Sequence, residues 1–389
     1  MNLIMTQKMI IPYLFVCLSL ATCNTDKNTC NNSNDLSGFT VYSLSDSLAS
    51  MEATMLYKNL SSLSGKGVMI GHQDALAYGI GWANEPFRSD INDVCGDFPA
   101  VFGWDLGMIG DASNIDNVSF DRMKQWAVEA YTRGGINTYS WHINNIASGG
   151  NAWDTKPCVS KILPGGVYHE AFVSKLDLVA EFFSGLKNDY GELIPVIFRP
   201  WHEMNGGWFW WGSKSCSPEE YKKLYQFTVD YLRNVKLLHN VIFAFSPDVF
   251  RTAEEYLTYY QGDEYVDILG VDDYRFMKNS GDVPRTVEML EILDRISTER
   301  SKLFAITETG LETIPDPEWF TGVVLKALSA NSLTKKTSWV LFWRNGMLNH
   351  FYAPYPGHSS APDFIKFKND SLTYFLSDIK DIYGRQINP

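Results

Sequence analysis

The sequence has few basic residues relative to acidic ones: 33 Lys and Arg against 45 Asp and Glu, which gives a net charge of −12. A protein that binds nucleic acid needs a basic surface to meet the phosphates, so we expect no nucleic-acid partner. Low-complexity segments, internal repeats and a Gly-rich phosphate-binding turn after the first expected strand are missing too. Their absence argues against a repeat protein and against a dinucleotide-binding fold.

Cysteine is scarce, with 6 residues in 389, and their spacings match no metal site. We therefore expect no metal site, and we expect no cofactor either. Apart from Cys17 and Cys23 near the N-terminus, the sequence has Cys30, Cys95, Cys158 and Cys216. Cys158 and Cys216 both fall in expected loops, where they either form a disulfide or remain free thiols.

A long apolar run is also missing. The stretch from Met9 to Ala21, which follows Lys8, is too short to span a bilayer and is typical of a signal peptide. It ends in "LATC", which resembles a bacterial lipobox with Cys23 as the lipidated residue. We expect a signal peptide over 1–22, a polar tether over 23–37, and an exported protein held to a membrane by this lipid alone. Thr22 replaces the usual Gly, Ala or Ser, and plain secretion is the alternative.

What the sequence does contain, from about Gly67 onward, is a regular alternation of short apolar runs with longer amphipathic ones. The short runs are rich in β-branched and aromatic residues, as buried parallel strands are. Eight are expected strands: Gly67–Asp74, Pro99–Gly107, Gly134–His142, Ile194–Glu203, Asn240–Asp248, Val266–Tyr274, Lys302–Gly310 and Ser338–Gly346. Eight strands with helices between them predict an α/β protein with a single (β/α)8 TIM-barrel domain over 38–389.

Helical patterns fill the gaps between these strands. Apolar residues recur at helical spacing between Phe172 and Leu186 and so share one helix face. Ser217-Pro-Glu-Glu220 predicts a capping box with Pro at the first helical position. Asp316-Pro317 is expected to open another helix in the same way.

Polar residues stand at the end of every expected strand, where barrel enzymes build their active sites. Two carboxylates stand out, Glu203 after the fourth strand and Glu308 at the end of the seventh. Such a pair suits glycoside hydrolysis, in which one carboxyl protonates the leaving oxygen and the other attacks the anomeric carbon or activates water. A lone carboxylate at a strand end could instead form a salt bridge.

Four aromatic residues, Trp208 to Trp211, follow Glu203 closely. We expect them to line a cleft in which sugar rings stack, and the apolar surroundings to raise the pKa of Glu203 so that it serves as a general acid. Trp210 and Trp211 could alternatively belong to the core. Glu308 should need hydrogen-bond donors that keep it ionised. The candidates are Arg199, His202 and Tyr274.

The motifs "RPWHEMNGGWFWWG", from Arg199 to Gly212, and "TETG", around Glu308, resemble those of glycoside hydrolase family 26. The resemblance runs from "GHQDALAYG" to "LFWRNG". The resemblance implies a retaining enzyme with Glu203 as acid/base and Glu308 as nucleophile. The usual activity of that family is endo-β-1,4-mannanase.

The same resemblance implies further substrate-binding residues: His142, His202, Trp208, Tyr274, Trp343 and Arg344. Tyr274 matches the tyrosine that hydrogen-bonds the nucleophile. Three simpler interpretations stand beside these. His142 could be a core histidine, Arg344 could only pair with a carboxylate, and His72 and Asp105 could be structural. Adjacent Asp272 and Asp273 point to opposite faces of a strand and so do not form a joint metal site.

The expected partner is a β-mannan polysaccharide or manno-oligosaccharide, and we expect a monomer. Two alternatives remain. The same fold and mechanism could act on another β-glycan, such as β-1,3-xylan or mixed-linkage β-glucan, or the chain could be a non-catalytic glycan-binding lipoprotein. The second alternative leaves the presence of both Glu203 and Glu308 unexplained.

Overall fold

The computed structural model describes residues 42–379 and 381–384. The expected signal peptide, Cys23, the tether and Cys30 lie outside the described residues. All that follows concerns the described part of the chain.

Eight parallel strands close into a barrel, because β1 pairs with β10 as well as with β4. The barrel strands are β1 (Val68–Gln73), β4 (Val101–Asp105), β5 (Ile136–Ser140), β6 (Val196–Arg199), β7 (Val241–Phe245), β8 (Ile268–Asp273), β9 (Leu303–Thr309) and β10 (Trp339–Phe342). Each strand lies within one of the eight segments expected from the sequence. The predicted (β/α)8 barrel is therefore confirmed.

All eight strands are buried along their whole length. One face of each strand points into the barrel and the other is covered by helices, which is why apolar residues occur on both faces of the strands and do not simply alternate with polar ones. The short apolar runs of the sequence follow directly from this double burial.

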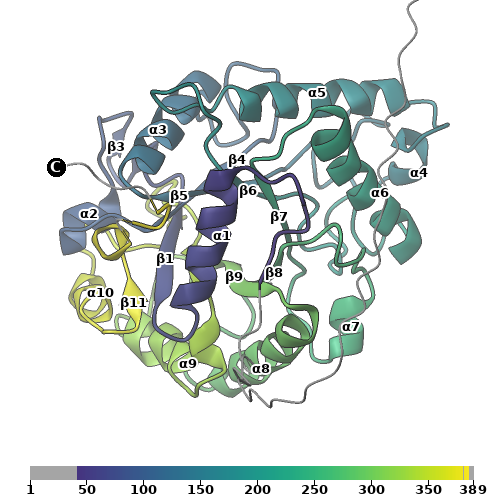
Figure 1. Cartoon of the computed structure of the whole chain (residues 1–389). Helices are drawn as coiled ribbons and strands as arrows, with labels where there is room; N and C mark the ends of the chain where they lie inside the picture. Colours follow the sequence, from purple (N-terminus) through teal and green to yellow (C-terminus); the bar gives the residue numbers. More distant parts are fainter. Residues whose placement is uncertain (1–41, 380, 385–389) are drawn as a thin grey trace, which may run out of the picture. The chain divides into compact units, whose positions relative to one another are not determined.

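Helices surround the barrel, and α1 (Met51–Leu63) lies across its N-terminal end (Figure 1). The Tyr57 hydroxyl of α1 donates to the Asp267 carbonyl oxygen, just before β8, at 2.8 Å. The other α-helices are α2 (Asp90–Cys95), α3 (Phe120–Thr132), α4 (Val159–Ile162), α5 (His169–Ser184), α6 (Pro218–Asp230), α7 (Ala253–Leu257), α8 (Val283–Arg300), α9 (Lys326–Leu328) and α10 (Ala361–Lys368).

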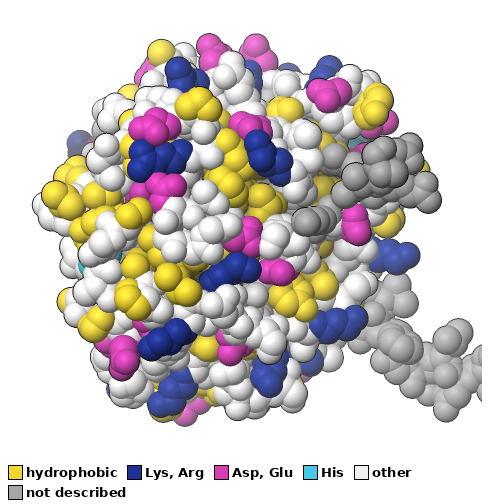
Figure 2. Space-filling view, turned by 90° about the vertical axis from the view of Figure 1, so that its left-hand side faces the viewer, with side chains coloured by type: hydrophobic (Ala, Val, Ile, Leu, Met, Phe, Trp, Pro, Cys, Tyr) yellow, Lys and Arg dark blue, Asp and Glu magenta, His cyan; other side chains and the backbone are white. Residues whose placement is uncertain are grey.

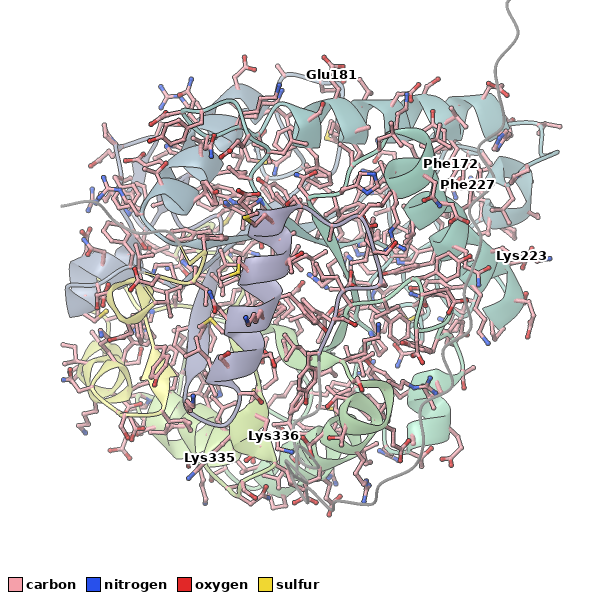
Figure 3. The ribbon with its side chains drawn as sticks, in the orientation of Figure 1. Phe172, Glu181, Lys223, Phe227, Lys335 and Lys336 are labelled. Carbon is pink, nitrogen blue, oxygen red and sulfur yellow. The ribbon has the colours of Figure 1, made fainter. Side chains whose placement is uncertain are left out.

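Two of these helices show how the pattern in the sequence becomes packing. The apolar face predicted for α5 is buried, and Phe172 on it lies beside Phe227 of α6 with ring centroids 5.8 Å apart (Figure 3). The predicted capping box at the start of α6 is present: Ser217 Oγ accepts from the Glu220 N–H, and the Glu220 carboxylate accepts from the Ser217 N–H.

The helix expected at Asp316-Pro317 begins later and has a different form. Asp316 accepts from the Glu318 and Trp319 N–H groups, which closes a tight turn before any helix starts. The π-helix η2 (Phe320–Leu325) follows and runs into α9. The aspartate side chain competes with helical geometry here, as short polar side chains often do.

Several short elements were not expected from the sequence. A hairpin of β2 (Tyr78–Gly79) and β3 (Trp82–Ala83) follows β1, and β11 (Thr373–Tyr374) pairs with β1. The remaining elements are π-helix η1 (Tyr231–Val235) and the 3-10 helices η3 (Thr334–Lys336) and η4 (Leu376–Asp378). Pairs of two residues carry too little periodic signal to be recognised.

On the flank shown in Figure 2, anionic, cationic and apolar side chains are interspersed without a large area of one sign. Over residues 42–379 and 381–384, the helices lack the length and apolar character needed to cross a membrane.

Candidate active site

The two carboxylates singled out in the sequence come together at the C-terminal end of the barrel. Glu308 lies in β9 and is buried, and Glu203 follows β6 by one turn and is half-buried. A register shift between Val271 and Asp272 makes Asp272 of β8 the direct neighbour of Glu308. Such irregularities re-aim side chains at strand ends, next to active sites.

Two donors hold the Glu308 carboxylate, one on each oxygen. Arg199 Nη2 donates to Oε2, and the Tyr274 hydroxyl donates to Oε1 at 2.8 Å. Burial and the Glu308 charge raise the pKa of Tyr274 well above its usual value, so the phenol keeps its proton and remains a donor. The structure thus places two of the three expected donors on Glu308.

A buried ion pair fixes Arg199 in turn. Its Nη1 donates to Asp272 Oδ2 at 2.6 Å, and Asp272 Oδ1 accepts from the Ser246 and Thr307 hydroxyls, each at 2.8 Å. With its guanidinium held by Asp272 on one side, Arg199 presents a fixed positive charge to Glu308. Asp273 points the other way and accepts from Thr286 of α8, as the alternation of a strand requires.

The pKa of Glu203 is raised well above its usual value. Burial is the largest cause, followed by the negative charges of Asp272, Glu308 and Asp248, while the hydrogen bond from Trp208 acts in the opposite direction. The pKa shift expected for Glu203 from its aromatic surroundings is thus present, with neighbouring carboxylates as a further cause. A raised pKa favours the protonated form of the carboxyl, which is the form that a general acid needs.

Each tryptophan of the motif donates its indole N–H to a specific acceptor. Trp208 donates to Glu203 Oε2 at 2.7 Å, Trp210 to the Ile143 carbonyl oxygen at 2.9 Å, and Trp211 to the His202 carbonyl oxygen at 2.8 Å. Gly206 makes the first bond possible, because a Cβ there would lie 2.3 Å from the Trp208 ring.

The expected aromatic wall is therefore only partly correct. Trp208 is half-buried and beside the acid, but Phe209, Trp210 and Trp211 are buried in the core. Trp210 and Trp211 are fully buried against the Ile143 and His202 carbonyls and offer no surface on which a sugar could stack. A buried indole N–H needs a hydrogen-bond acceptor, so the positions of the Ile143 and His202 carbonyl oxygens determine where these two side chains lie.

His142 and His202 form a buried pair with Nε2 atoms 3.2 Å apart. Burial opposes a charge on His142, but its Nδ1 lies 2.7 Å from Asp105 Oδ2, and this carboxylate raises the pKa of His142. Burial, Arg199 and His142 lower the pKa of His202 well below its usual value. The lowered pKa of His202 favours its neutral form. His202, one of the three candidate donors to Glu308, lies against His142 instead. Asp105 is buried and orients His142.

One exposed aromatic residue in this region was missed at the level of sequence. Trp153, in the loop after β5, is 47% exposed and stacks on His142 with ring centroids 5.3 Å apart. The ring of His142 also lies edge-on to that of the half-buried Trp343, with ring centroids 6.2 Å apart. A tryptophan in a long polar loop after a barrel strand was the available signal, but nothing in the sequence says that this loop folds back over the barrel.

Arg344 does pair with a carboxylate, as the simpler interpretation allowed. Its Nε lies 3.0 Å from Asp116 Oδ1, and its Nη1 lies 3.5 Å from the Tyr78 hydroxyl, which donates to Asp74 at 2.6 Å. The Arg344 side chain remains 22% exposed, so pairing and contact with a ligand are compatible.

Cys158 and Cys216 are both buried free thiols, so the disulfide considered for them is not formed. The Cys216 thiol donates instead to the Trp211 carbonyl oxygen, within the same motif. Cys95 is also free.

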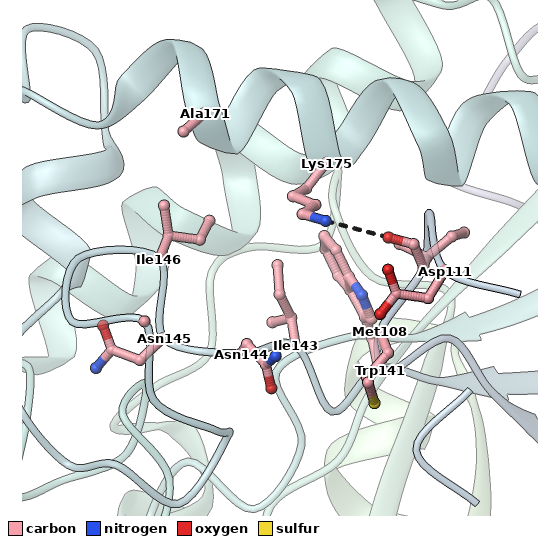
Figure 4. A pocket seen from close by; sticks show the side chains of 11 residues that line it. Met108, Asp111, Trp141, Ile143, Asn144, Asn145, Ile146, Ala171 and Lys175 are labelled. Carbon is pink, nitrogen blue, oxygen red and sulfur yellow. Dashed lines mark hydrogen bonds between the residues drawn. The ribbon is translucent and has the colours of Figure 1, made fainter. Parts of the chain in front are cut away.

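A separate cavity of about 270 Å³ lies between the loops after β4 and β5 and helix α5 (Figure 4). Lys175 of α5 donates across it to the Ile109 carbonyl oxygen at 3.2 Å. The cavity is lined by Trp141 and Ile143, the neighbours of His142, and by neither catalytic candidate. None of its lining residues is among the candidate site residues.

Sequence and structure comparisons agree with this arrangement. The profile described as "Glycosyl hydrolase family 26" matches residues 45–345. A mannan endo-1,4-beta-mannosidase from Bifidobacterium adolescentis is 34% identical over 86% of this chain, but the match spans only 35% of that protein. The structure of a GH26 beta-mannanase from Bacteroides ovatus is 42% identical, with a TM-score of 0.83 over 87% of this chain and 99% of that one.

A modular endo-beta-1,4-mannanase from Cellulomonas fimi is also similar. It is 33% identical, with a TM-score of 0.83 over 89% of this chain and 80% of that chain. Together with the profile match over most of the described barrel, these similarities establish the family. The chain belongs to glycosyl hydrolase family 26.

Proposed function

We propose that this protein hydrolyses β-1,4-mannosidic bonds in mannan, glucomannan or galactomannan, with retention of anomeric configuration, as an enzyme of the mannan endo-1,4-β-mannosidase type. The observation that carries this proposal is the contrast between the two carboxyls. Glu203 has a raised pKa and lies against an indole, whereas both Glu308 oxygens accept hydrogen bonds from Arg199 and Tyr274. Two carboxyls in such different environments suit an acid and a nucleophile.

In the first step, Glu308 attacks the anomeric carbon while Glu203 gives its proton to the departing glycosidic oxygen. The bond to the leaving sugar breaks and a glycosyl ester of Glu308 forms. In the second step, Glu203, now a carboxylate, takes a proton from water, which attacks the same carbon and releases Glu308. Arg199 and Tyr274 direct Glu308 and stabilise its charge when the ester breaks.

The surrounding side chains supply substrate contacts. His142 and Trp343 contact each other, and Trp153 stacks on His142 with an exposed ring that a sugar face can cover. Arg344 offers charged donors, and Trp208 lies beside Glu203 on the side of the departing sugar. His202 lies against His142 in the same region. No metal ion or cofactor takes part in these steps.

Reducing-sugar release from a panel of glycans tests the proposal. Mannan, glucomannan and galactomannan should be cleaved, and β-1,3-xylan and mixed-linkage β-glucan should not. Proton NMR of the first product should show the β-anomer before mutarotation. If only another β-glycan is cleaved, that glycan is the substrate of the same mechanism. Binding of a glycan without release of reducing sugar would identify a non-catalytic glycan-binding protein.

We also propose that the protein is exported, held to a bacterial membrane by a lipid on Cys23, and monomeric. The apolar segment ending in "LATC" and the polar stretch after it support the anchor. Full-length protein should fractionate with membranes, and Cys23→Ser should release it or block its processing. A wild-type protein found entirely in the soluble fraction would contradict the anchor, and light scattering at twice the chain mass would contradict the monomer.

A further inference from the structure

The turn that carries Glu203 has an unusual backbone. Trp201 and Glu203 have φ angles of 58° and 54°, in the left-handed region that residues with a Cβ rarely adopt. Two such residues within three positions cost free energy, and they persist only where the surroundings determine the conformation. The groups that hold this turn are therefore candidates for positioning Glu203.

Helix α6 supplies two of these groups, both fully buried. The Tyr221 hydroxyl donates to the Trp201 carbonyl oxygen at 3.0 Å, and Trp201 Nε1 donates to Thr228 Oγ1 at 3.1 Å. Thr228 uses its own hydrogen on the Leu224 carbonyl oxygen, at 2.8 Å, so its oxygen can accept from the indole. The backbone and the side chain of Trp201 are thus both attached to α6.

The next peptide of the turn is held from elsewhere. Trp211 donates to the His202 carbonyl oxygen at 2.8 Å, and the Glu203 N–H donates to the Ser246 carbonyl oxygen at 2.7 Å. In the peptide that joins Trp201 to His202, by contrast, the carbonyl oxygen accepts from the Tyr221 hydroxyl. Without that hydroxyl the buried carbonyl would lose its hydrogen bond, and rotation of this peptide toward another donor would displace His202 and Glu203.

We infer that Tyr221 and Thr228 of α6 are positioning residues for the acid/base: they hold the left-handed turn and so keep Glu203 directed at the leaving oxygen. This inference rests on the proposed function. Neither residue touches the substrate. Their effect should therefore follow the need for acid catalysis rather than the strength of binding.

The experiment compares Tyr221→Phe, Thr228→Val and the double variant with Tyr57→Phe. Tyr57 is a matched control, because its buried hydroxyl also donates to a backbone carbonyl, at 2.8 Å, but at the N-terminal end of the barrel. Circular dichroism and melting temperature select folded samples. For each protein, kcat and KM are measured on β-mannan, and the first step is measured on a dinitrophenyl β-mannobioside, whose phenolate leaves without a proton.

In the double variant we expect kcat on mannan to fall about tenfold or more, equivalent to about 1.4 kcal/mol, with KM within twofold. The first step on the aryl glycoside should stay within twofold of wild type. Tyr57→Phe should leave both rates unchanged. Equal loss on both substrates would overturn the inference, as would a folded double variant with wild-type kcat.

Failure of the proposed function gives a different result: the wild-type protein would then cleave neither substrate. In that case a crystal structure of the double variant decides the inference by itself. A shift of Trp201 or Glu203 out of the left-handed region supports it, and an unchanged turn overturns it.

Discussion

The hydrogen bond between Trp208 and Glu203 allows a prediction with a definite sign. The indole N–H, 2.7 Å from Oε2, stabilises the ionised carboxylate and lowers the pKa of Glu203 against the larger upward effect of burial. Trp208→Phe removes this donor and keeps a ring beside Arg275, which lies 5.6 Å from the indole centroid. The pKa of Glu203 should therefore rise.

The magnitude follows from the kind of bond. A hydrogen bond to a charged group contributes about 1.5–3 kcal/mol, and the half-buried position of Glu203 favours the lower end. Since 1.36 kcal/mol corresponds to one pKa unit, the alkaline limb of the plot of kcat/KM against pH should move by about one pH unit. The acid must be protonated to work, so activity is lost as pH rises through this pKa, and a higher pKa moves the limb to higher pH.

The assay is kcat/KM on soluble β-mannan across the pH range, which reports ionisations of the free enzyme. Asp248→Asn is a control of opposite sign. The Asp248 charge raises the pKa of Glu203 and pairs with Arg275 at 2.7 Å, so its removal should move the limb to lower pH. An unmoved limb in Trp208→Phe, or movement of both variants in the same direction, would refute Glu203 as the group that controls the limb.

Three further substitutions test the site. Glu308→Ala should abolish turnover on all substrates with little loss of folding, and a folded variant with wild-type activity would remove the nucleophile assignment. Glu203→Ala should nearly abolish mannan hydrolysis but spare the first step on an activated aryl glycoside. The ester on Glu308 should then accumulate, and added azide should speed its release. Equal loss on both substrates would mean that the two roles are exchanged. Trp153→Ala should raise KM for manno-oligosaccharides about fivefold or more, since stacking contributes about 1 kcal/mol or somewhat more, and leave the azide response intact; unchanged KM would exclude Trp153 from the substrate site.

The sequence was sufficient for the fold, and it identified Glu203 and Glu308 as candidates at one end of the barrel. Double burial made each barrel strand a short segment rich in apolar residues, and all eight expected segments contain strands. Glu203 and Glu308 stood out because acids at the ends of such strands meet at one end of a barrel. The capping box at Ser217 was visible because both of its bonds are local.

Residues whose contacts are distant in sequence were harder to assign. The four aromatics after Glu203 looked alike as letters, yet Trp208 lies beside the acid while Trp210 and Trp211 are buried in the core. Which indole faces the site depends on where Glu203, Ile143 and His202 offer acceptors. For the same reason His202 was one of three candidate donors to Glu308, whereas it lies against His142.

By itself, then, the sequence determined the barrel strands and the capping box at Ser217, because burial periodicity and local capping are properties of neighbouring residues. It also proposed Glu203 and Glu308 as the catalytic candidates. Only the tertiary structure decided the left-handed turn at Trp201 and Glu203, its attachment to α6, and the place of Trp153 beside His142. These depend on bonds between elements that chain folding brings together, and no local pattern records which donor will meet which acceptor.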